Sequence, residues 1–206
     1  MLVSVRRRRR WPAREAGAVI RLVARHTLEM PPGVYWKRCF LDAAYERELF
    51  LAELRYARFD SDNRTQPGTL GPHGTVELTS RRVVAEPGAH DVPFAHVIGR
   101  ALAYVEQGTL DQRKGVYMFG VRNLVLPDAL TLRGAILVEA TSYTRSVFVA
   151  EVDAEVSLLG IGDAIEKRLE HELRRSFRLA VELANVWVAA DGGAGLATFR
   201  AGRKLR

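Results

Sequence analysis

Cysteine is nearly absent from this sequence: Cys39 is the only one among 206 residues. A single thiol cannot form a disulfide within the chain, and it cannot build the multi-cysteine clusters that hold structural zinc. Phe40 and Leu41 follow it directly, and apolar neighbours of this kind predict a buried, unreactive thiol. A disulfide framework, a thiolate metal site and a cysteine nucleophile are therefore all disfavoured.

The chain also lacks long hydrophobic runs. No stretch of about 18 apolar residues occurs, so we expect no transmembrane helix. The short apolar stretch 16–20 ends at Arg21, before it reaches the length of a secretory signal. These two observations favour a cytoplasmic protein.

Motifs for common cofactors and catalytic centres are missing as well. The sequence has no Gly-x-Ser-x-Gly elbow, no Walker A loop and no Gly-x-Gly-x-x-Gly fingerprint. His73, His90 and His96 are separated by loop-like stretches and fall outside the His-Glu-x-x-His pattern of zinc enzymes. We expect no metal and no cofactor, and no residue is assigned a catalytic role.

Arginine is abundant, and its excess is concentrated at the two ends. The net charge of +7 comes from +5 in the first 17 residues and +4 in the last 15, which leaves −2 for the middle. We interpret residues 1–18 as a basic tail, 19–190 as one folded domain and 191–206 as a flexible basic tail. An arginine block near the N-terminus predicts a weak contact with an anionic surface, and no specific nucleic acid is expected. The block consists of Arg6, Arg7, Arg8, Arg9 and Arg10, and a translated upstream stretch without a role would explain it equally.

Alternating apolar and polar residues predict β-strands through most of the middle. The strands expected from this pattern are 19–30, 75–86, 104–110, 116–125, 132–143 and 147–158. In the second of them, we assign Val76 and Val84 to the buried face, and Thr79 and Arg81 to the exposed face. The stretch 60–74 is rich in Asp, Asn, Gly and Pro, which predicts a hairpin loop.

Two other segments have helical periodicity. Within residues 34–54, Asp42 predicts a new N-cap that divides the segment into two short helices. A helix of about 28 residues is expected after Asp163, and its apolar residues recur mostly at four-residue steps. This stripe contains Ile161, Ile165, Leu169, Leu173, Phe177, Val181 and Val188. Packing across a sheet explains the stripe better than a coiled coil, because four-residue steps drift away from a heptad.

The order of these elements predicts an α+β protein of the helix-grip type. A curved antiparallel sheet of about six or seven strands would grip the long C-terminal helix, with two short helices after the first strand. A strongly curved sheet leaves space beneath such a helix, so we expect a ligand cavity there. Ile136 and Phe177 are among the apolar residues expected to line it.

Four polar residues are candidates to orient a ligand in that cavity. His26 belongs to the mainly apolar face of the first strand, although a core histidine satisfied by a neighbour would give the same pattern. Tyr104 and Glu106 share one face of their strand. Arg122 stands among apolar residues, and we interpret it as the ion-pair partner of Glu106 across a hairpin. A structural tyrosine beside a solvent-facing glutamate is the alternative.

Three sequence patterns carry a resemblance to a known family. They are His26-Thr27-Leu28-Glu29-Met30-Pro31 followed by Tyr35-Trp36, Tyr104-Val105-Glu106-Gln107-Gly108 with Asp111, and Leu158-Leu159-Gly160-Ile161-Gly162 before a helix with Glu170, Arg174, Arg175 and Ser176. Over residues 19–190 the chain resembles the START-like superfamily (helix-grip, SRPBCC) of polyketide cyclases and lipid-transport domains. Within it, the chain is similar to a bacterial family of unknown function. The resemblance implies a pocket for a hydrophobic molecule, often without catalysis, and it transfers no catalytic residue.

The leading hypothesis is therefore a module that binds a hydrophobic small molecule or lipid, for transport or sequestration. A cyclase or hydratase that uses His26, Tyr104 and Glu106 in the same cavity is the enzymatic alternative. A third hypothesis is an adaptor for nucleic acid or a membrane surface that acts through the arginine block.

Overall fold

Among the residues that the structure describes, seven antiparallel strands form one sheet in this computed structural model. The described residues are 18–67, 77–87, 103–124, 130–156 and 162–191. In sheet order the strands are β1 (Ala18–Leu28), β7 (Ser146–Val156), β6 (Leu130–Ala140), β5 (Val116–Asn123), β4 (Tyr104–Asp111), β3 (Glu77–Pro87) and β2 (Tyr56–Pro67). The predicted α+β class with an antiparallel sheet is confirmed.

The helices occur where the sequence predicts them. The short helices α1 (Pro32–Tyr35), η1 (Trp36–Phe40), α2 (Ala43–Arg47) and η2 (Glu48–Glu53) follow the first strand, and α3 (Gly162–Ala189) follows the last one. The predicted N-cap is confirmed, because the Asp42 side chain accepts hydrogen bonds from the backbone N–H groups of Ala44 and Tyr45. No helix of the described ranges combines the length and the apolarity that a bilayer span requires.

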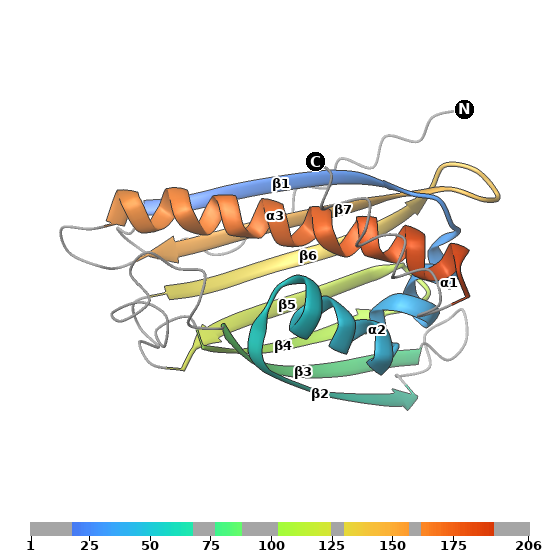
Figure 1. Ribbon diagram of the computed structural model, residues 1–206, viewed down its shortest axis with the longest axis horizontal. Helices are drawn as coiled ribbons and strands as arrows, with labels where there is room; N and C mark the ends of the chain where they lie inside the picture. Colours follow the sequence, from blue (N-terminus) through green and yellow to red (C-terminus); the bar gives the residue numbers. More distant parts are fainter. Residues whose placement is uncertain (1–17, 68–76, 88–102, 125–129, 157–161, 192–206) are drawn as a thin grey trace.

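All helices of the described chain lie on one face of the sheet, which we call the inner face. Figure 1 shows α3 running along β1 and β7, whereas the short helices cover the half of the sheet formed by β2 to β5. Helix α3 contacts β1 and β7 and also touches η1 and η2. The opposite side of the sheet, the outer face, carries the alternate side chains of every strand.

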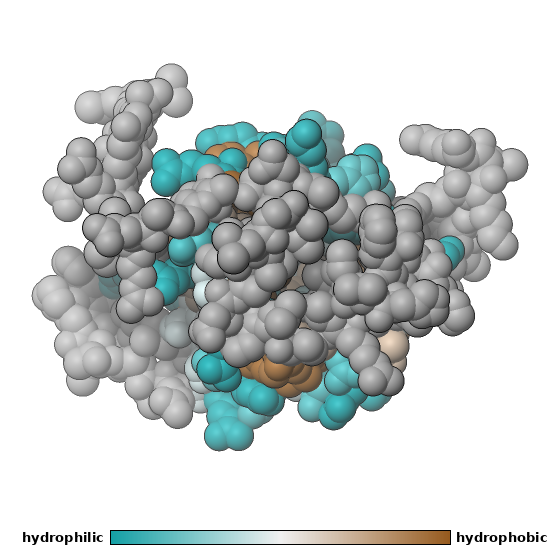
Figure 2. Space-filling model, turned by 90° about the vertical axis from the view of Figure 1, so that its left-hand side faces the viewer, coloured by the Kyte–Doolittle hydropathy of each residue, from teal (hydrophilic) through white to brown (hydrophobic). Residues whose placement is uncertain are grey.

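The core fills the space between the inner face and the helices. Leu28, Phe148, Leu183 and Tyr117 are among its side chains, each at most 1% exposed. The described surface seen from the end at which α3 begins is mainly hydrophilic, with small hydrophobic patches (Figure 2). Cys39 lies in this core, where burial raises the pKa of its thiol to about 12, as expected for an unreactive cysteine.

The predicted buried face of β3 is wrong. Thr79, Arg81, Val83 and Ala85 are the buried residues of this strand, with at most 6% exposure. Val83 and Ala85 supply the apolar residues of the buried face, and Arg81 pairs there with the Glu46 carboxylate of α2. The buried face therefore combines apolar side chains with an ion pair, and the prediction based on Val84 chose the opposite face.

The predicted hairpin loop 60–74 is also partly wrong, because β2 continues to Pro67. Strand β2 is an edge of the sheet, and its outer face carries Asp62 and Arg64, which pair with each other. Its inner face carries Ser61, which bonds to a buried glutamate. Polar residues therefore occupy both faces, and the apolar alternation that indicates a strand is lost.

The arginine block and the three loop histidines lie outside the described residues.

The β4–β5 hairpin offers a prediction about pH. The Asp111 side chain is only 16% exposed, and it accepts a hydrogen bond from the backbone N–H of Lys114 at 3.0 Å and pairs with the Lys114 ammonium at 2.7 Å. Burial works against the charged carboxylate, yet these contacts outweigh it and lower the pKa of Asp111. A carboxyl group whose pKa falls on folding stabilises the protein above its unfolded pKa of about 3.9, and the contribution disappears as the pH falls through the folded value.

We expect Asp111→Asn to lower the free energy of unfolding by about 1 kcal/mol at pH 7. The deficit should shrink as the pH falls below about 4, because the wild-type carboxyl then also becomes neutral. Urea unfolding of both proteins between pH 7 and pH 2.5 measures this. A deficit that stays constant over the whole range would show that the charge of Asp111 is not the cause.

Candidate functional site

A cluster of charged and hydroxyl side chains lies on the inner face beneath α2. The inner polar cluster consists of Glu46, Ser61, Arg81, Glu106 and Tyr117. Arg81 Nη1 donates to Glu46 Oε1 and, at 2.9 Å, to the carbonyl oxygen of Phe40. Ser61 Oγ donates to the second oxygen of Glu46 at 2.7 Å. The Glu46 and Arg81 side chains are only 2% and 5% exposed, so this ion pair is fully desolvated.

Glu106 joins the cluster from β4 and is its most accessible carboxylate. Tyr117 Oη donates to Glu106 Oε1 at 2.7 Å, and Arg81 Nε lies 3.5 Å from the same oxygen. Gly108 makes room for the Tyr117 ring, because a Cβ at that position would meet the ring at 2.4 Å. The Glu106 side chain is 16% exposed. Within the described chain both polar contacts of Glu106 use Oε1, so Oε2 can accept a hydrogen bond from a ligand.

Aromatic rings enclose the guanidinium of Arg81. Its Cζ atom lies 4.4 Å from the centroid of Phe40 and 6.0 Å from that of Tyr117. The Tyr117 ring in turn stacks on Phe119 at 5.5 Å. The Phe40 ring covers the cluster on the side of η1, and the Phe119 ring packs in the same apolar group as residues of α3.

Burial and nearby carboxylates keep the phenols of Tyr117, in the cluster, and Tyr104, outside it, protonated. Burial, followed by the charge of Glu106, raises the pKa of Tyr117. Burial also raises the pKa of Tyr104, with Tyr56 and Glu106 adding to the effect. For Glu46, burial raises the pKa, while the guanidinium of Arg81 opposes that shift. The site therefore offers hydrogen-bond donors and carboxylate acceptors rather than a phenolate base.

An apolar surface adjoins the cluster where side chains of β5 and α3 pack against the same buried residues of β1, β6 and β7. Its partly buried side chains, which we call the α3–β5 apolar surface, are Phe119, Val121, Leu169, Leu173 and Phe177. They pack around buried residues that include Leu132 and Val152. Val121 is the cross-strand partner of Glu106. A carboxylate and an incompletely covered apolar surface therefore lie next to each other on the inner face.

The sequence prediction for Tyr104 and Glu106 is confirmed in its geometry, because both side chains belong to the inner face. His26 also lies on this face, half-buried, with its ring 6.5 Å from that of Phe148. Burial lowers the pKa of His26. The negative charge of Glu182 acts to raise this pKa, and the positive charge of Arg178 lowers it further. The histidine therefore adjoins an aromatic neighbour and two charges of α3.

The two predicted apolar residues are placed differently from each other. Ile136 is a core residue, 8% exposed, and the cross-strand partner of Tyr117. Phe177 is partly buried, and its ring lies 5.9 Å from that of Phe148. Phe177 thus belongs to the α3–β5 apolar surface, whereas Ile136 forms part of the packed core.

The predicted Glu106–Arg122 ion pair is wrong. Glu106 is opposite Val121 in the β4–β5 register, and Arg122 is opposite Val105. Cross-strand partners share a face, so Arg122 projects from the outer face, where it is exposed. Arg81 from β3 occupies the place of the predicted partner. Sequence analysis missed Arg81, Glu46 and Tyr117, since hydrophobicity patterns contain no signal for a buried ion pair between distant elements.

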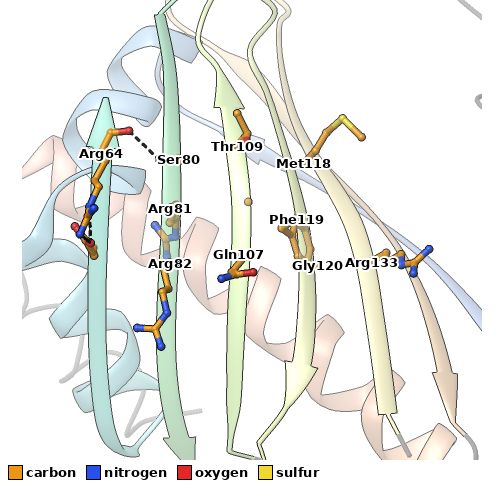
Figure 3. Close-up of a pocket in the computed structure, with 12 residues that line it drawn as sticks. Arg64, Ser80, Arg81, Arg82, Gln107, Thr109, Met118, Phe119, Gly120 and Arg133 are labelled. Atoms are coloured by element: carbon orange, nitrogen blue, oxygen red, sulfur yellow. Dashed lines mark hydrogen bonds and ion pairs between the residues drawn. The ribbon is translucent and has the colours of Figure 1, made fainter. Parts of the chain in front are cut away.

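The expected cavity and the observed hollow lie on opposite faces of the sheet. A hollow of about 680 Å³ opens on the outer face, across strands β2 to β6 (Figure 3). A smaller one of about 380 Å³ lies between α2 and β2 and is lined in part by Ser61. No group of three His, Cys, Asp or Glu side chains suited to a metal ion occurs within the described ranges.

Comparison with known proteins identifies the fold. No protein-family model and no curated protein matches the sequence. The Zhui aromatase/cyclase from Streptomyces sp. R1128 matches over 82% of this chain and 92% of its own, with 10% identity and a TM-score of 0.53. The match to norcoclaurine synthase from Thalictrum flavum covers 85% of this chain and 94% of the synthase chain, with 10% identity and a TM-score of 0.53. This chain has the START-like, helix-grip fold.

A third solved structure agrees with this assignment. A protein from Thermus thermophilus matches over 84% of this chain and 100% of its own, with 14% identity and a TM-score of 0.55. At identities this low the START-like likeness establishes the arrangement of the strands and helices. The chemistry of the site has to be argued from the residues of this chain.

Proposed function

We propose that this protein binds a small, largely apolar molecule between α3 and β5, with the polar end of the ligand at Glu106. The observation that carries the proposal is the α3–β5 apolar surface, whose side chains stay partly exposed beside an accessible carboxylate. Other apolar side chains of the inner face, such as Leu28 and Tyr117, are at most 1% exposed. A ligand that covers this surface gains about 25 cal/mol for each Å² of apolar area buried.

The charges of the site favour a ligand that donates hydrogen bonds. The inner polar cluster contains two carboxylates, Glu46 and Glu106, and one guanidinium, Arg81. Glu46 is enclosed, so a ligand can reach only Glu106. An amine, phenol or alcohol at one end of an apolar molecule meets these requirements. Norcoclaurine synthase, whose structure holds dopamine and hydroxybenzaldehyde, supports small aromatic molecules of this type.

An enzymatic role in the same place is the second candidate function. The aromatase/cyclase that shares this fold supports it, as does the Glu106–Tyr117 hydrogen bond, which joins an acceptor and a donor at the proposed ligand end. His26 contacts Phe148 instead of this pair, so the three residues of the enzymatic alternative (His26, Tyr104 and Glu106) do not form one hydrogen-bonded set. Simple binding therefore needs fewer assumptions than catalysis.

A cytoplasmic location and a weak contact of Arg6–Arg10 with anionic surfaces remain predictions.

Fluorescence titration with the neutral probe N-phenyl-1-naphthylamine tests the apolar part of the proposal. We expect saturable binding to the wild type and an affinity at least tenfold lower for Leu173→Gln, because an amide interrupts the apolar surface. Leu51→Gln is the matched control, since Leu51 is a 40% exposed leucine on η2, away from this surface. Equal affinities for all three proteins would contradict the proposed location.

The cation 1-naphthylmethylamine tests the polar part. Glu106→Gln keeps the size of the side chain and an oxygen that can accept from Tyr117, but it removes the charge. We expect the affinity for this amine to fall about tenfold, because a hydrogen bond between two charged groups is lost. The affinity for the neutral probe should change less than threefold. A parallel loss for both probes would show that Glu106 supports the fold and does not select the ligand.

A further inference from the structure

The hollow on the outer face is a second candidate site, separate from the proposed ligand site. Strands β2 to β6 form its floor, and α3 lies behind the sheet in Figure 3. Its volume of about 680 Å³ is within the range of small-molecule sites, roughly 300–1,000 Å³. We call it the outer hollow; its outward-facing lining is Asp62, Arg64, Ser80, Arg82, Gln107, Thr109, Met118, Gly120 and Arg133.

The register of the sheet explains why a hollow forms there. Arg82, Gln107, Gly120 and Arg133 are successive cross-strand partners from β3 to β6, so they form one row on the outer face. Gly120 contributes no side chain to the row. A Cβ at this position would have only the Leu132 carbonyl oxygen, at 3.9 Å, within contact distance. The centre of the row is therefore open space between two arginines.

The row carries an excess of positive charge. Asp62 is held by Arg64, with Nε at 2.9 Å from its carboxylate. The cross-strand partner of Arg133 on β7 is Asp153, which pairs with Arg21 at 2.9 Å. Among the described residues no carboxylate forms an ion pair with Arg82 or Arg133. Both guanidiniums are thus available to an anion.

We propose that the outer hollow binds the phosphate group of a soluble small molecule, held over Gly120 between Arg82 and Arg133. A guanidinium presents a planar fork of donors that matches phosphate oxygens. The two arginines are on strands three spacings apart, about 14 Å, so they approach a ligand from opposite sides. The three terminal oxygens of a phosphate monoester point in different directions and carry more than one negative charge at pH 7, so they can engage both guanidiniums.

Neutral groups beside the row complete a small-molecule site. Gln107 and Thr109 supply an amide and a hydroxyl on β4, and Met118 supplies an apolar contact for the body of the ligand. The phosphate site is recessed at Gly120 between longer side chains, which hold a flat membrane surface away from the floor. This geometry favours a soluble phosphate compound over a lipid headgroup.

A titration of the full chain with phenyl phosphate, followed by ¹H–¹⁵N NMR, tests the proposal. We expect saturable shifts centred on the amides of Gln107 and Gly120. Gly120→Val fills the open centre with a residue suited to a strand, and it should abolish these shifts. Arg82→Gln should weaken binding about tenfold, since it removes a charged donor but stays folded as an exposed substitution.

Arg25→Gln is the matched control, because Arg25 is also exposed on the outer face but lies on β1, far from the row. It should change the affinity less than twofold. Unchanged binding by Gly120→Val and Arg82→Gln would overturn the proposal, and so would an equal loss in Arg25→Gln. Shifts at Gly120 that appear with phosphatidic acid vesicles or an oligonucleotide, but not with phenyl phosphate, would overturn it as well.

Discussion

Replacing Arg81 by leucine is expected to lower the free energy of unfolding by about 3–5 kcal/mol. The substitution leaves Glu46 buried without its cation, and a 2% exposed carboxylate cannot recover its hydration while the protein stays folded. It also removes the guanidinium that lies 4.4 Å from the centroid of the Phe40 ring. Urea unfolding monitored by circular dichroism measures the loss.

Arg82→Leu is the control for this experiment. Arg82 is the next residue along β3, but it is exposed on the outer face, so its replacement should change stability by no more than about 0.5 kcal/mol. The double variant Arg81→Leu with Glu46→Leu should recover much of the loss, because the uncompensated carboxylate is then absent. If Arg81→Leu lowers the free energy of unfolding by no more than Arg82→Leu does, the inner polar cluster is not the desolvated network described above.

Leu183→Ala should have an effect of similar size, about 2–5 kcal/mol. Leu183 is 0% exposed on the half of α3 that packs over the aromatic residues of η1, and its truncation leaves a cavity there. Thermal and urea unfolding both report this change. The result measures how strongly the long helix is held against the sheet.

Phe177→Ala provides the comparison. Burial of Phe177 is only partial, and the same is true of Leu173 one turn earlier, so its truncation should cost less than Leu183→Ala despite the larger side chain. A greater loss at Phe177 than at Leu183 would mean that the part of α3 around Phe177, and not the part around Leu183, is packed more tightly against the core. The α3–β5 apolar surface would then be too well covered to receive a ligand.

Local signals predicted most of the fold. The alternation in β1 and β7 and the cap at Asp42 come from neighbouring residues, so they are visible in the sequence. The face of β3 could not be predicted this way. An arginine such as Arg81 is assigned to the exposed face until its partner is known, and that partner, Glu46, is 35 positions away along the chain.

The candidate site was predicted in part for the same reason. Tyr104 and Glu106 were found because two residues on one strand share a face. Arg122 was misplaced because pairing two strands requires the exact register, and a shift of one residue moves a side chain to the other face. The outer hollow depends on a row of residues from four strands, with Gly120 at its centre, and only the assembled sheet brings them together.

Isotope-filtered NMR of the complex with N-phenyl-1-naphthylamine tests the central claim most directly. With methyl-labelled protein and unlabelled probe, each intermolecular NOE identifies a methyl group within about 5–6 Å of the ligand. We expect NOEs to Val121, Leu169 and Leu173, which belong to the α3–β5 apolar surface. A bound probe whose NOEs are confined to Met118 and Val105 on the outer face would contradict it, and the ligand site between α3 and β5 would have to be abandoned.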